Sequence, residues 1–229
     1  MKQSLLEVVR TRVLLSDGAM GTQLQLAGLE AGGCGEAWNA DQPDRVAAIQ
    51  KRYAEAGSDC LITNTFGCSR FRLSLHGQDG RVHELNKAAA QIARKVIGPD
   101  RYVLGDIGPF GGFLEPLGET TREELIEEFE KQASALAEGG ADAIIIETMT
   151  ALDELECAIE ASKRATKLPV IASMAFDKIQ DGSYRTMMGV TPKQGVELMV
   201  SAGADVVGAN CGTGLDIRDY VKIVEAFRA

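Results

Sequence analysis

Short apolar runs alternate along the chain with longer segments in which apolar residues recur at helical spacing. The runs end in polar or glycine-rich stretches, as is typical of buried strands that open into loops. Strands with their exits are predicted, by residue number, at 13–15, 60–66, 102–109, 143–146, 170–174 and 205–212. Helices are predicted at 44–56, 85–97, 121–138, 151–165, 191–202 and 216–228. A helix follows every strand, so the pattern predicts a series of strand-helix units.

The same four-residue junction recurs three times between a predicted helix and the next strand. It is Ala-Gly-Ser-Asp at 56–59, Gly-Gly-Ala-Asp at 139–142 and Ala-Gly-Ala-Asp at 202–205. In each copy a glycine ends the helix and an acid opens the strand. This repetition favours stacked units around a parallel sheet.

Two helices carry clear starting signals. Thr121 and Glu124 have the spacing of a capping box, and Thr191 precedes a proline with Gln194 three residues on. We therefore expect helices to begin at these two threonines.

The units predict an α/β fold of the (β/α)8 TIM-barrel type, in which eight units close the barrel. Only about the first six βα units are found in residues 1–229, which we interpret as one barrel domain, incomplete at its C-terminal side. An open doubly wound sheet is the alternative. Its most common marker, an early Gly-x-Gly-x-x-Gly turn with an acid downstream, is absent from the sequence.

Charge and cysteine content narrow the class of protein. A formal net charge of -9, without clustered Lys and Arg, argues against binding to nucleic acid or to an anionic membrane. The first residues lack the apolar core of a signal peptide, and no stretch has membrane-spanning length. The five cysteines are an odd, scattered set that does not suggest a disulfide framework. We expect reduced thiols and a cytoplasmic location.

The residues that could carry chemistry lie at the predicted strand exits. They are Asp17, Thr63, Asn64, Thr65, Phe66, Asp106, Glu147, Ser173, Asp177, Asn210 and Cys211. Glu147 directly follows three isoleucines, so its carboxylate needs a cationic or hydrogen-bonding partner at the edge of a buried sheet. It can be a structural acid or the receptor of an amino group. Cys211 can be a small core residue or a reactive thiol.

The other candidates also have structural interpretations. Asp17 and Asp106 lie next to glycine-containing turns and can serve those turns, Asp106 more readily than Asp17. Thr65 can bond the loop backbone, and Phe66 can be a core aromatic. Neither histidine lies at a strand exit, so a Cys-His nucleophile pair has little support.

Taken in chain order, the strand exits form a recognisable set of motifs. Asp17-Gly18-Ala19-Met20-Gly21-Thr22, Thr63-Asn64-Thr65-Phe66-Gly67, Gly105-Asp106-Ile107-Gly108-Pro109, Ile146-Glu147-Thr148 and Gly208-Ala209-Asn210-Cys211 resemble, in order and spacing, those of the homocysteine S-methyltransferase family. The likeness is strongest to the homocysteine-binding barrel at the front of cobalamin-dependent methionine synthases. It runs from about residue 10 to the end.

The resemblance implies a zinc-containing barrel that binds homocysteine and transfers a methyl group to its sulfur. Cys211 matches one of three cysteines that hold the zinc. Glu147 and Asp17 match positions that hold the substrate amine, and Thr65 and Phe66 match the wall of the pocket. The implied donor is methylcobalamin on a separate corrinoid-binding module, charged from methyltetrahydrofolate. S-adenosylmethionine and S-methylmethionine are family alternatives.

The family's other two zinc cysteines, an adjacent pair after the eighth strand, have no match in this sequence. Cys34 and Cys68 are two further cysteines in the sequence, but their spacing does not identify them as replacements for the missing pair. An incomplete barrel exposes two sheet edges, so we expect self-association or a completing chain. Two other functions stay open: a catalytically incomplete amino-acid-binding subunit, and a lyase that binds magnesium or manganese through Asp17, Asp106 and Glu147.

Overall fold

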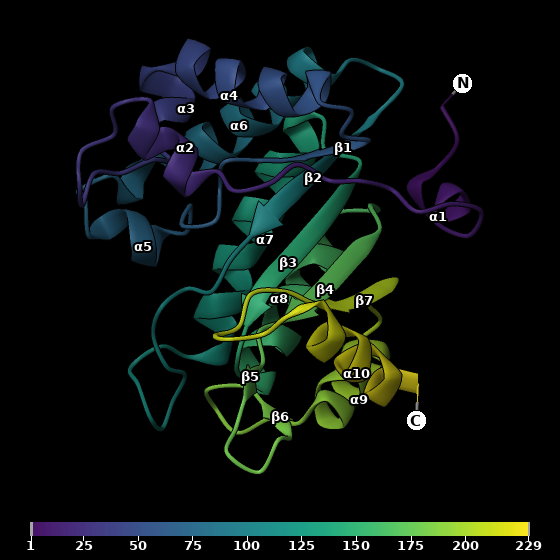
Figure 1. Cartoon of the computed structure of the whole chain (residues 1–229). Helices are drawn as coiled ribbons and strands as arrows, with labels where there is room; N and C mark the ends of the chain where they lie inside the picture. Colours follow the sequence, from purple (N-terminus) through teal and green to yellow (C-terminus); the bar gives the residue numbers. More distant parts are fainter. Residues whose placement is uncertain (1, 229) are drawn as a thin grey trace.

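The computed structural model describes residues 2–228, which form a five-stranded parallel sheet with helices packed along it (Figure 1). The helices are α1 (Leu5–Val8), α2 (Gly21–Leu26), α3 (Trp38–Asp41), α4 (Pro43–Glu55), α5 (Arg70–Ser74), the 3-10 turn η1 (Asp79–Arg81), α6 (Val82–Ile97), α7 (Arg122–Gly139), α8 (Leu152–Ala165), α9 (Pro192–Ser201) and α10 (Ile217–Arg228). The strands are β1 (Cys60–Ile62), β2 (Tyr102–Ile107), β3 (Ala143–Met149), β4 (Val170–Met174), β5 (Asp177–Lys178), β6 (Tyr184–Arg185) and β7 (Val206–Ala209).

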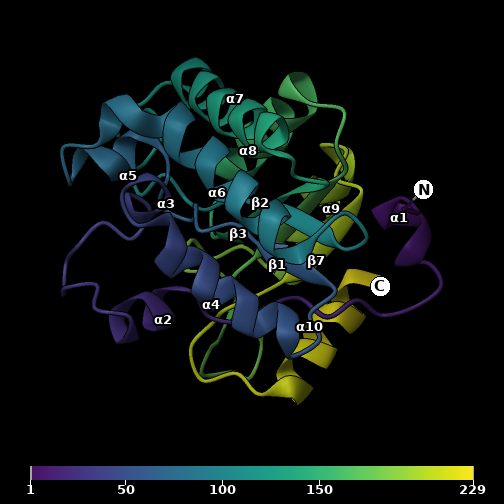
Figure 2. The same ribbon diagram turned by 90° about the horizontal axis from the view of Figure 1, so that it is seen from above.

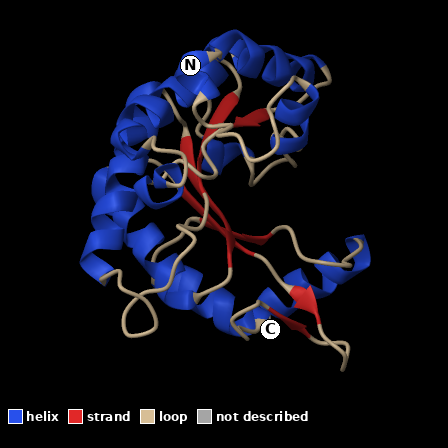
Figure 3. Ribbon diagram, turned by 90° about the vertical axis from the view of Figure 1, so that its left-hand side faces the viewer, coloured by secondary structure: helices blue, strands red, loops and turns tan. Residues whose placement is uncertain are grey.

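The order of strands in the sheet is their order in the chain, β1-β2-β3-β4-β7, and every pair is parallel. Ser16 extends this order by one position, because it makes a parallel bridge with Cys60. A doubly wound sheet would reverse its order at a switch point, and this sheet does not. The helices follow an arc outside the strands (Figure 3), which is the arrangement of a β/α barrel and confirms the predicted fold class.

Alternate side chains along the strands belong to two different hydrophobic clusters. One set, which includes Val103 and Ile144, packs beneath the helices in the main hydrophobic cluster. The other set, which includes Leu104 and Ala143, points to the inner side of the arc and forms a second cluster. Leu5 and Val8 of α1 belong to this second cluster, so α1 covers the N-terminal ends of the strands. Figure 2 shows α1 set apart from the outer helices.

The sequence predicts most of the large elements within a few residues. The capping boxes at Thr121 and Thr191 are both present at the starts of α7 and α9. The three junction glycines, Gly57, Gly140 and Gly203, have φ values of 108°, 103° and 91°. The left-handed conformation at each explains why glycine recurs there.

The prediction was wrong for the first strand. Its side chains at Val13 and Leu15 are 83% and 63% exposed, and only Ser16 is bridged to the sheet. The sixth strand was predicted to be buried, but β7 is half-buried because within residues 2–228 it pairs on one side only, with β4. The ribbon β5–β6 occupies a segment predicted as loop. None of the helices in residues 2–228 has the length and apolar character needed to cross a membrane.

Candidate functional site

The C-terminal ends of the strands open into a cleft of about 830 Å³. Its lining residues are Asp17, Gly18, Ala19, Met20, Gly21, Leu24, Leu29, Gly33, Gly35, Glu36, Ile62, Thr63, Asn64, Thr65, Phe66, Arg72, His76, Asp106, Glu147, Thr148, Asn210 and Cys211. All five residues that the sequence predicts to bind substrate or metal are among them. This is the end of the sheet at which β/α barrels build their sites.

Asn210 lies at the centre of a hydrogen-bonded network at the exits of β3 and β7. Its amide nitrogen donates to Glu147 Oε2 and to Thr148 Oγ1, both at 2.7 Å. Its Oδ1 accepts from the Ser173 hydroxyl at 2.7 Å and from the Thr148 N–H at 2.9 Å. Both ends of the Asn210 amide are therefore used, and they fix the Glu147 carboxylate between two strands.

Cys211 lies beside this network and is the one exposed cysteine of the described residues. Its Sγ is 3.5 Å from the Asn210 amide nitrogen and 3.7 Å from Thr148 Oγ1. Thr148 and Cys211 have φ values of 61° and 52°, and they are the only non-glycine residues in 2–228 with positive φ. Such backbone is strained, most of all for a β-branched residue, and it gathers at functional sites.

Asp17 reaches the cleft from the segment that bridges to β1. Its Oδ1 accepts the Ile62 N–H at 3.0 Å and the Ser16 hydroxyl at 3.1 Å. Burial raises the pKa of Asp17 to about 6, with a further contribution from the Glu147 charge. Asp17 therefore changes its protonation state close to neutral pH.

Asp106 and Glu147 form a pair of carboxyl groups at the base of the cleft. Asp106 is 2% exposed, and burial together with the charges of Glu147, Glu36 and Asp17 raises its pKa well above the usual range. Burial also raises the pKa of Glu147, while hydrogen bonds from Thr148 and Asp106 oppose that rise. Asp106, the more deeply buried of the two, therefore favours its neutral form beside Glu147.

Thr65 and Phe66 line the cleft in different ways. The Thr65 hydroxyl is buried, donates to the Asp106 main-chain carbonyl at 2.7 Å and lies 2.6 Å from Thr63 Oγ1. Its proton is already used within the protein. Phe66 is 41% exposed, and its ring lies so close to Gly108 that a side chain there would collide with it. Phe66 therefore presents an aromatic wall to the cleft.

The cysteines do not assemble into a zinc site within residues 2–228. Burial raises the pKa of Cys60 to about 12 and of Cys157 to about 11, and both lie where the sequence predicts, at the start of β1 and in α8. Cys34 packs against a separate cluster that contains buried Cys68, and neither cysteine lines the cleft. In the described part of the chain no group of three or more His, Cys, Asp and Glu side chains is arranged to hold a metal ion. Cys211 is a single thiol here, and a three-carboxylate magnesium site is not formed either.

Three residues of the cleft come from segments that have no strand-exit pattern in the sequence. Glu36 accepts the Gly67 N–H at 2.9 Å, while Arg72 and His76 lie on and just after α5. Arg72 carries the one guanidinium group among the lining residues. The sequence places Asn210 among the strand-exit candidates without a role of its own, although it organises the network.

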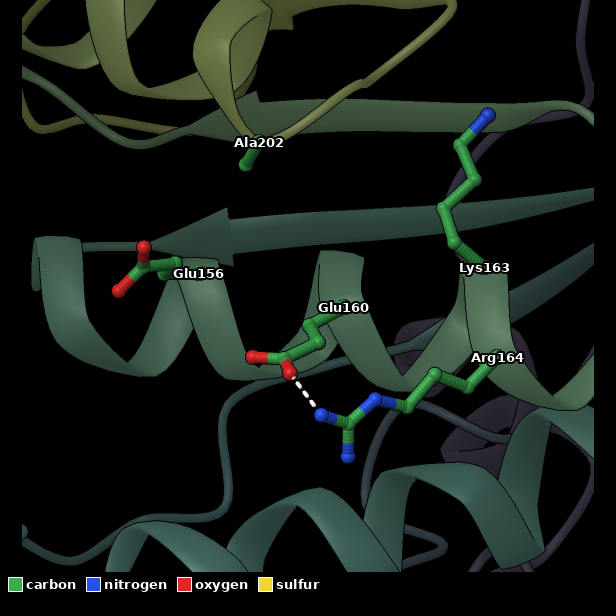
Figure 4. A pocket seen from close by; sticks show the side chains of 5 residues that line it. All are labelled: Glu156, Glu160, Lys163, Arg164 and Ala202. Carbon is green, nitrogen blue, oxygen red and sulfur yellow. Dashed lines mark hydrogen bonds and ion pairs between the residues drawn. The ribbon is translucent and has the colours of Figure 1, made fainter.

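A second hollow, of about 360 Å³, lies on the outer side of the fold between α8 and the end of α9. It is lined by Glu156, Glu160, Lys163, Arg164 and Ala202 (Figure 4). Its charges are already neutralised, because Glu160 pairs with Arg164 and Lys163 pairs with Asp205. We therefore place the candidate site at the strand ends instead.

The fold and the site together define a β/α-barrel domain with carboxylates and a thiol at the C-terminal ends of its strands. Residues 14–229 match the family described as homocysteine S-methyltransferase, and the chain belongs to this family. It is 36% identical to methionine synthase of Mycobacterium tuberculosis and 35% identical to that of Mycobacterium leprae. Both matches cover 92% of this chain, but only 19% and 18% of the relatives, so the chain spans about a fifth of their length.

Solved structures agree on the fold. The metallated form of the homocysteine methyltransferase MmuM from Escherichia coli has a TM-score of 0.76, 20% identity, and coverage of 96% of this chain and 81% of that one. Its apo form has a TM-score of 0.71, 20% identity, and coverage of 97% and 79%. The carboxyl transferase domain of Rhizobium etli pyruvate carboxylase has a TM-score of 0.54, 18% identity, and coverage of 99% and 38%. At these identities the likeness concerns the fold alone.

Proposed function

We propose that this protein is a homocysteine S-methyltransferase of the methionine synthase type, and that the cleft binds homocysteine. The observation that carries the proposal is the network of Glu147, Asn210 and Cys211, which places a carboxylate and an exposed thiol side by side at the strand ends. Membership of the family supports the class of reaction.

The substrate amine is the partner that the cleft acids lack. Glu147 and Asp17 make no ion pair with a basic side chain among residues 2–228. A half-buried carboxylate of this kind stabilises an entering ammonium group by charge and by hydrogen bonds. In our proposal these two acids hold the amine, and the Phe66 ring packs against the apolar part of the amino acid.

The substrate carboxylate needs an opposite charge. Arg72 is the one guanidinium that lines the cleft, and its side chain lies against Gly111. A planar guanidinium can bind a carboxylate through two parallel hydrogen bonds. We assign the carboxylate of homocysteine to Arg72.

Cys211 is proposed as one zinc ligand near the substrate sulfur. Residues 2–228 do not supply the other thiolates that such a site needs, so we assign these to chain outside the described part or to a partner. The methyl donor proposed from the resemblance is methylcobalamin on a corrinoid-binding module, charged from methyltetrahydrofolate. The five free thiols fit a cytoplasmic location.

Both edges of the sheet support the proposal that further β/α units complete this barrel domain. Val13 and Leu15 are exposed at one edge. At the other edge Ile217, Val221 and Val224 of α10 form an apolar stripe, with exposures of 76%, 52% and 42%. The covering units can belong to the same protein or to a partner, and the 229-residue chain alone should self-associate. A monomer in sedimentation that unfolds cooperatively would argue against this.

The test is methionine formation by the whole protein from homocysteine, with methylcobalamin, S-adenosylmethionine and S-methylmethionine compared as donors. We expect turnover with methylcobalamin and its loss in Cys211→Ser. Homocysteine binding without turnover from any donor would favour the second candidate, a catalytically incomplete amino-acid-binding subunit, which the incomplete metal site also favours. Absence of both would refute the proposed function.

A further inference from the structure

The Asp106 side chain has an oxygen atom with no hydrogen-bond partner. Oδ1 of this 98% buried group is itself buried and accepts no hydrogen bond in the described structure, although Asp106 is among the residues that line the cleft. Its main chain, in contrast, is fully used, because the N–H donates to Thr63 Oγ1 at 2.9 Å and the carbonyl accepts from Thr65 at 2.7 Å. A buried oxygen without a donor is costly, so its retention at a cleft needs an explanation.

Two other buried acids of this chain are satisfied within the protein, and a third, Glu128, has an oxygen without a hydrogen bond that lies 3.7 Å from Nε of Arg70. Glu154 accepts the Phe110 N–H at 2.8 Å, and Asp219 accepts the Tyr184 hydroxyl at 2.7 Å. The Asp106 carboxyl receives no N–H or O–H from its surroundings in residues 2–228, and it faces only the Glu147 carboxylate. Asp106 therefore keeps an open acceptor beside the acid to which we assign the substrate amine.

We propose that Asp106 belongs to the ammonium site: it holds a proton against Glu147 while the cleft is empty, and a primary ammonium group displaces that proton on binding. The inference deepens the proposed function and rests on it. In the exchange the Asp106 O–H bond breaks, its proton passes to the buffer, and an ammonium N–H donates to the carboxylate that remains. One positive charge enters and one leaves, so the two acids never face each other as bare anions.

The charged groups around Asp106 favour this exchange. Glu147, Glu36 and Asp17 act on it from three different segments, and all three disfavour a second negative charge in the empty cleft. Arg72 and His76 lie on the cleft lining, and among residues 2–228 neither makes an ion pair with Asp106. An ammonium group is the cation that turns Asp106 from the neutral to the ionised form.

The experiment is calorimetry of L-methionine binding to the whole protein, because methionine has the amine but no thiol that could release a proton. Titrations in phosphate and in Tris at pH 7 give the number of protons released. We expect the native protein to release about 0.5–1 proton and Asp106→Asn to release about none. We also expect about threefold to tenfold weaker binding in the variant.

Glu154→Gln is the matched control, since it also converts a buried acid with a raised pKa to the amide, outside the cleft. It should release protons as the native protein does. Equal proton release in Asp106→Asn and the native protein would overturn the inference while leaving the proposed function intact. Equally tight binding of 4-(methylthio)butanoate, which lacks the amine, or absence of binding by either methionine or homocysteine, would overturn both.

Discussion

The two ends of the parallel sheet carry the same kinds of acid and use them in opposite ways. At the N-terminal ends, the aspartate of each repeated junction accepts a main-chain hydrogen bond from an earlier segment of the sheet side of the fold. The three N–H donors are Leu15 for Asp59, Val103 for Asp142 and Val170 for Asp205, at 3.0, 2.8 and 2.8 Å. At the C-terminal ends, the strand exits place Asp17, Asp106 and Glu147 around the cleft.

The two ends of the sheet differ in whether a basic side chain lies beside each acid. Arg12 pairs with Asp59, Lys2 and Arg94 with Asp142, and Lys163 with Asp205. The hydrogen bond from Arg12 lowers the pKa of Asp59, whereas burial without a cation raises the pKa of the cleft acids. The charges of the N-terminal acids are thus paired within the protein and stabilise the fold. The cleft acids have no cation beside them, and in our proposal they are left for a positively charged ligand, which lowers stability while the cleft is empty.

The largest expected effect is on ligand binding in Glu147→Gln. The amide keeps the shape but loses the charge that faces the ammonium group, so affinity for homocysteine should fall roughly 100-fold, about 2–3 kcal/mol. The thermal unfolding midpoint should not fall, because a carboxylate with a raised pKa is itself unfavourable in the fold. Calorimetry and thermal unfolding measure the two quantities. Unchanged affinity would remove Glu147 from the site.

Asp142→Asn should show the reverse behaviour. The substitution removes the charge that holds Lys2 and Arg94 and weakens the bond to the Val103 N–H, so stability should fall by about 1–3 kcal/mol with unchanged homocysteine affinity. Urea unfolding of the whole protein gives the shift. Asp100→Asn, at an exposed acid of the same end, is the control and should change stability little. A loss of affinity in Asp142→Asn would erase the distinction between the two ends.

Asp17→Asn should be more stable than the native protein above pH 6, and it should bind homocysteine less tightly. Because the folded-state pKa is raised to about 6, the folded protein holds a proton between about pH 4 and 6 that the unfolded chain has lost. Native stability therefore falls as pH rises through this window, by roughly 2–3 kcal/mol, since one pKa unit corresponds to about 1.4 kcal/mol. Amine affinity should rise over the same window as Asp17 ionises. If the free energy of unfolding changed with pH from 4 to 8 in the same way in the native protein and in Asp17→Asn, the raised pKa would be contradicted.

Cys211→Ser should have the smallest effect on the fold and on amine binding. The thiol is exposed, and serine is nearly isosteric, so stability should stay within about 0.5 kcal/mol. Zinc content of the whole protein, measured by elemental analysis, should fall to background. Zinc that persists at the native level would show that Cys211 is not a ligand.

Sequence pattern predicts the frame of this fold better than its site. The caps at Thr121 and Thr191 and the junction glycines are local features, and the structure confirms them. The predicted strand 13–15 is not formed, because an apolar run forms a full strand only when neighbouring strands pair with it. In the described residues this segment has a neighbour on one side only. The pattern of apolar residues does not show whether a neighbouring strand is present to pair with such a run.

The site depends on contacts between residues far apart in the chain. Asp106 reads as a turn residue from its neighbours, and its pairing with Glu147 exists only once β2 and β3 lie side by side. Arg72 reaches the cleft from a short helix that has no strong periodicity. The positive φ of Thr148 runs against its β-branched side chain, so propensity predicts the opposite. Motif resemblance locates Glu147 and Cys211, but the Asn210 network that joins them requires the fold.

The most direct test compares homocysteine with 4-mercaptobutanoate, the same molecule without its amine, on the native protein and on Glu147→Gln. If the unpaired acids of the cleft bind an ammonium group, the native protein should prefer homocysteine by roughly 100-fold, and the variant should lose most of that preference. Equal affinity of the native protein for both ligands, or a preference that survives in Glu147→Gln, would contradict the account.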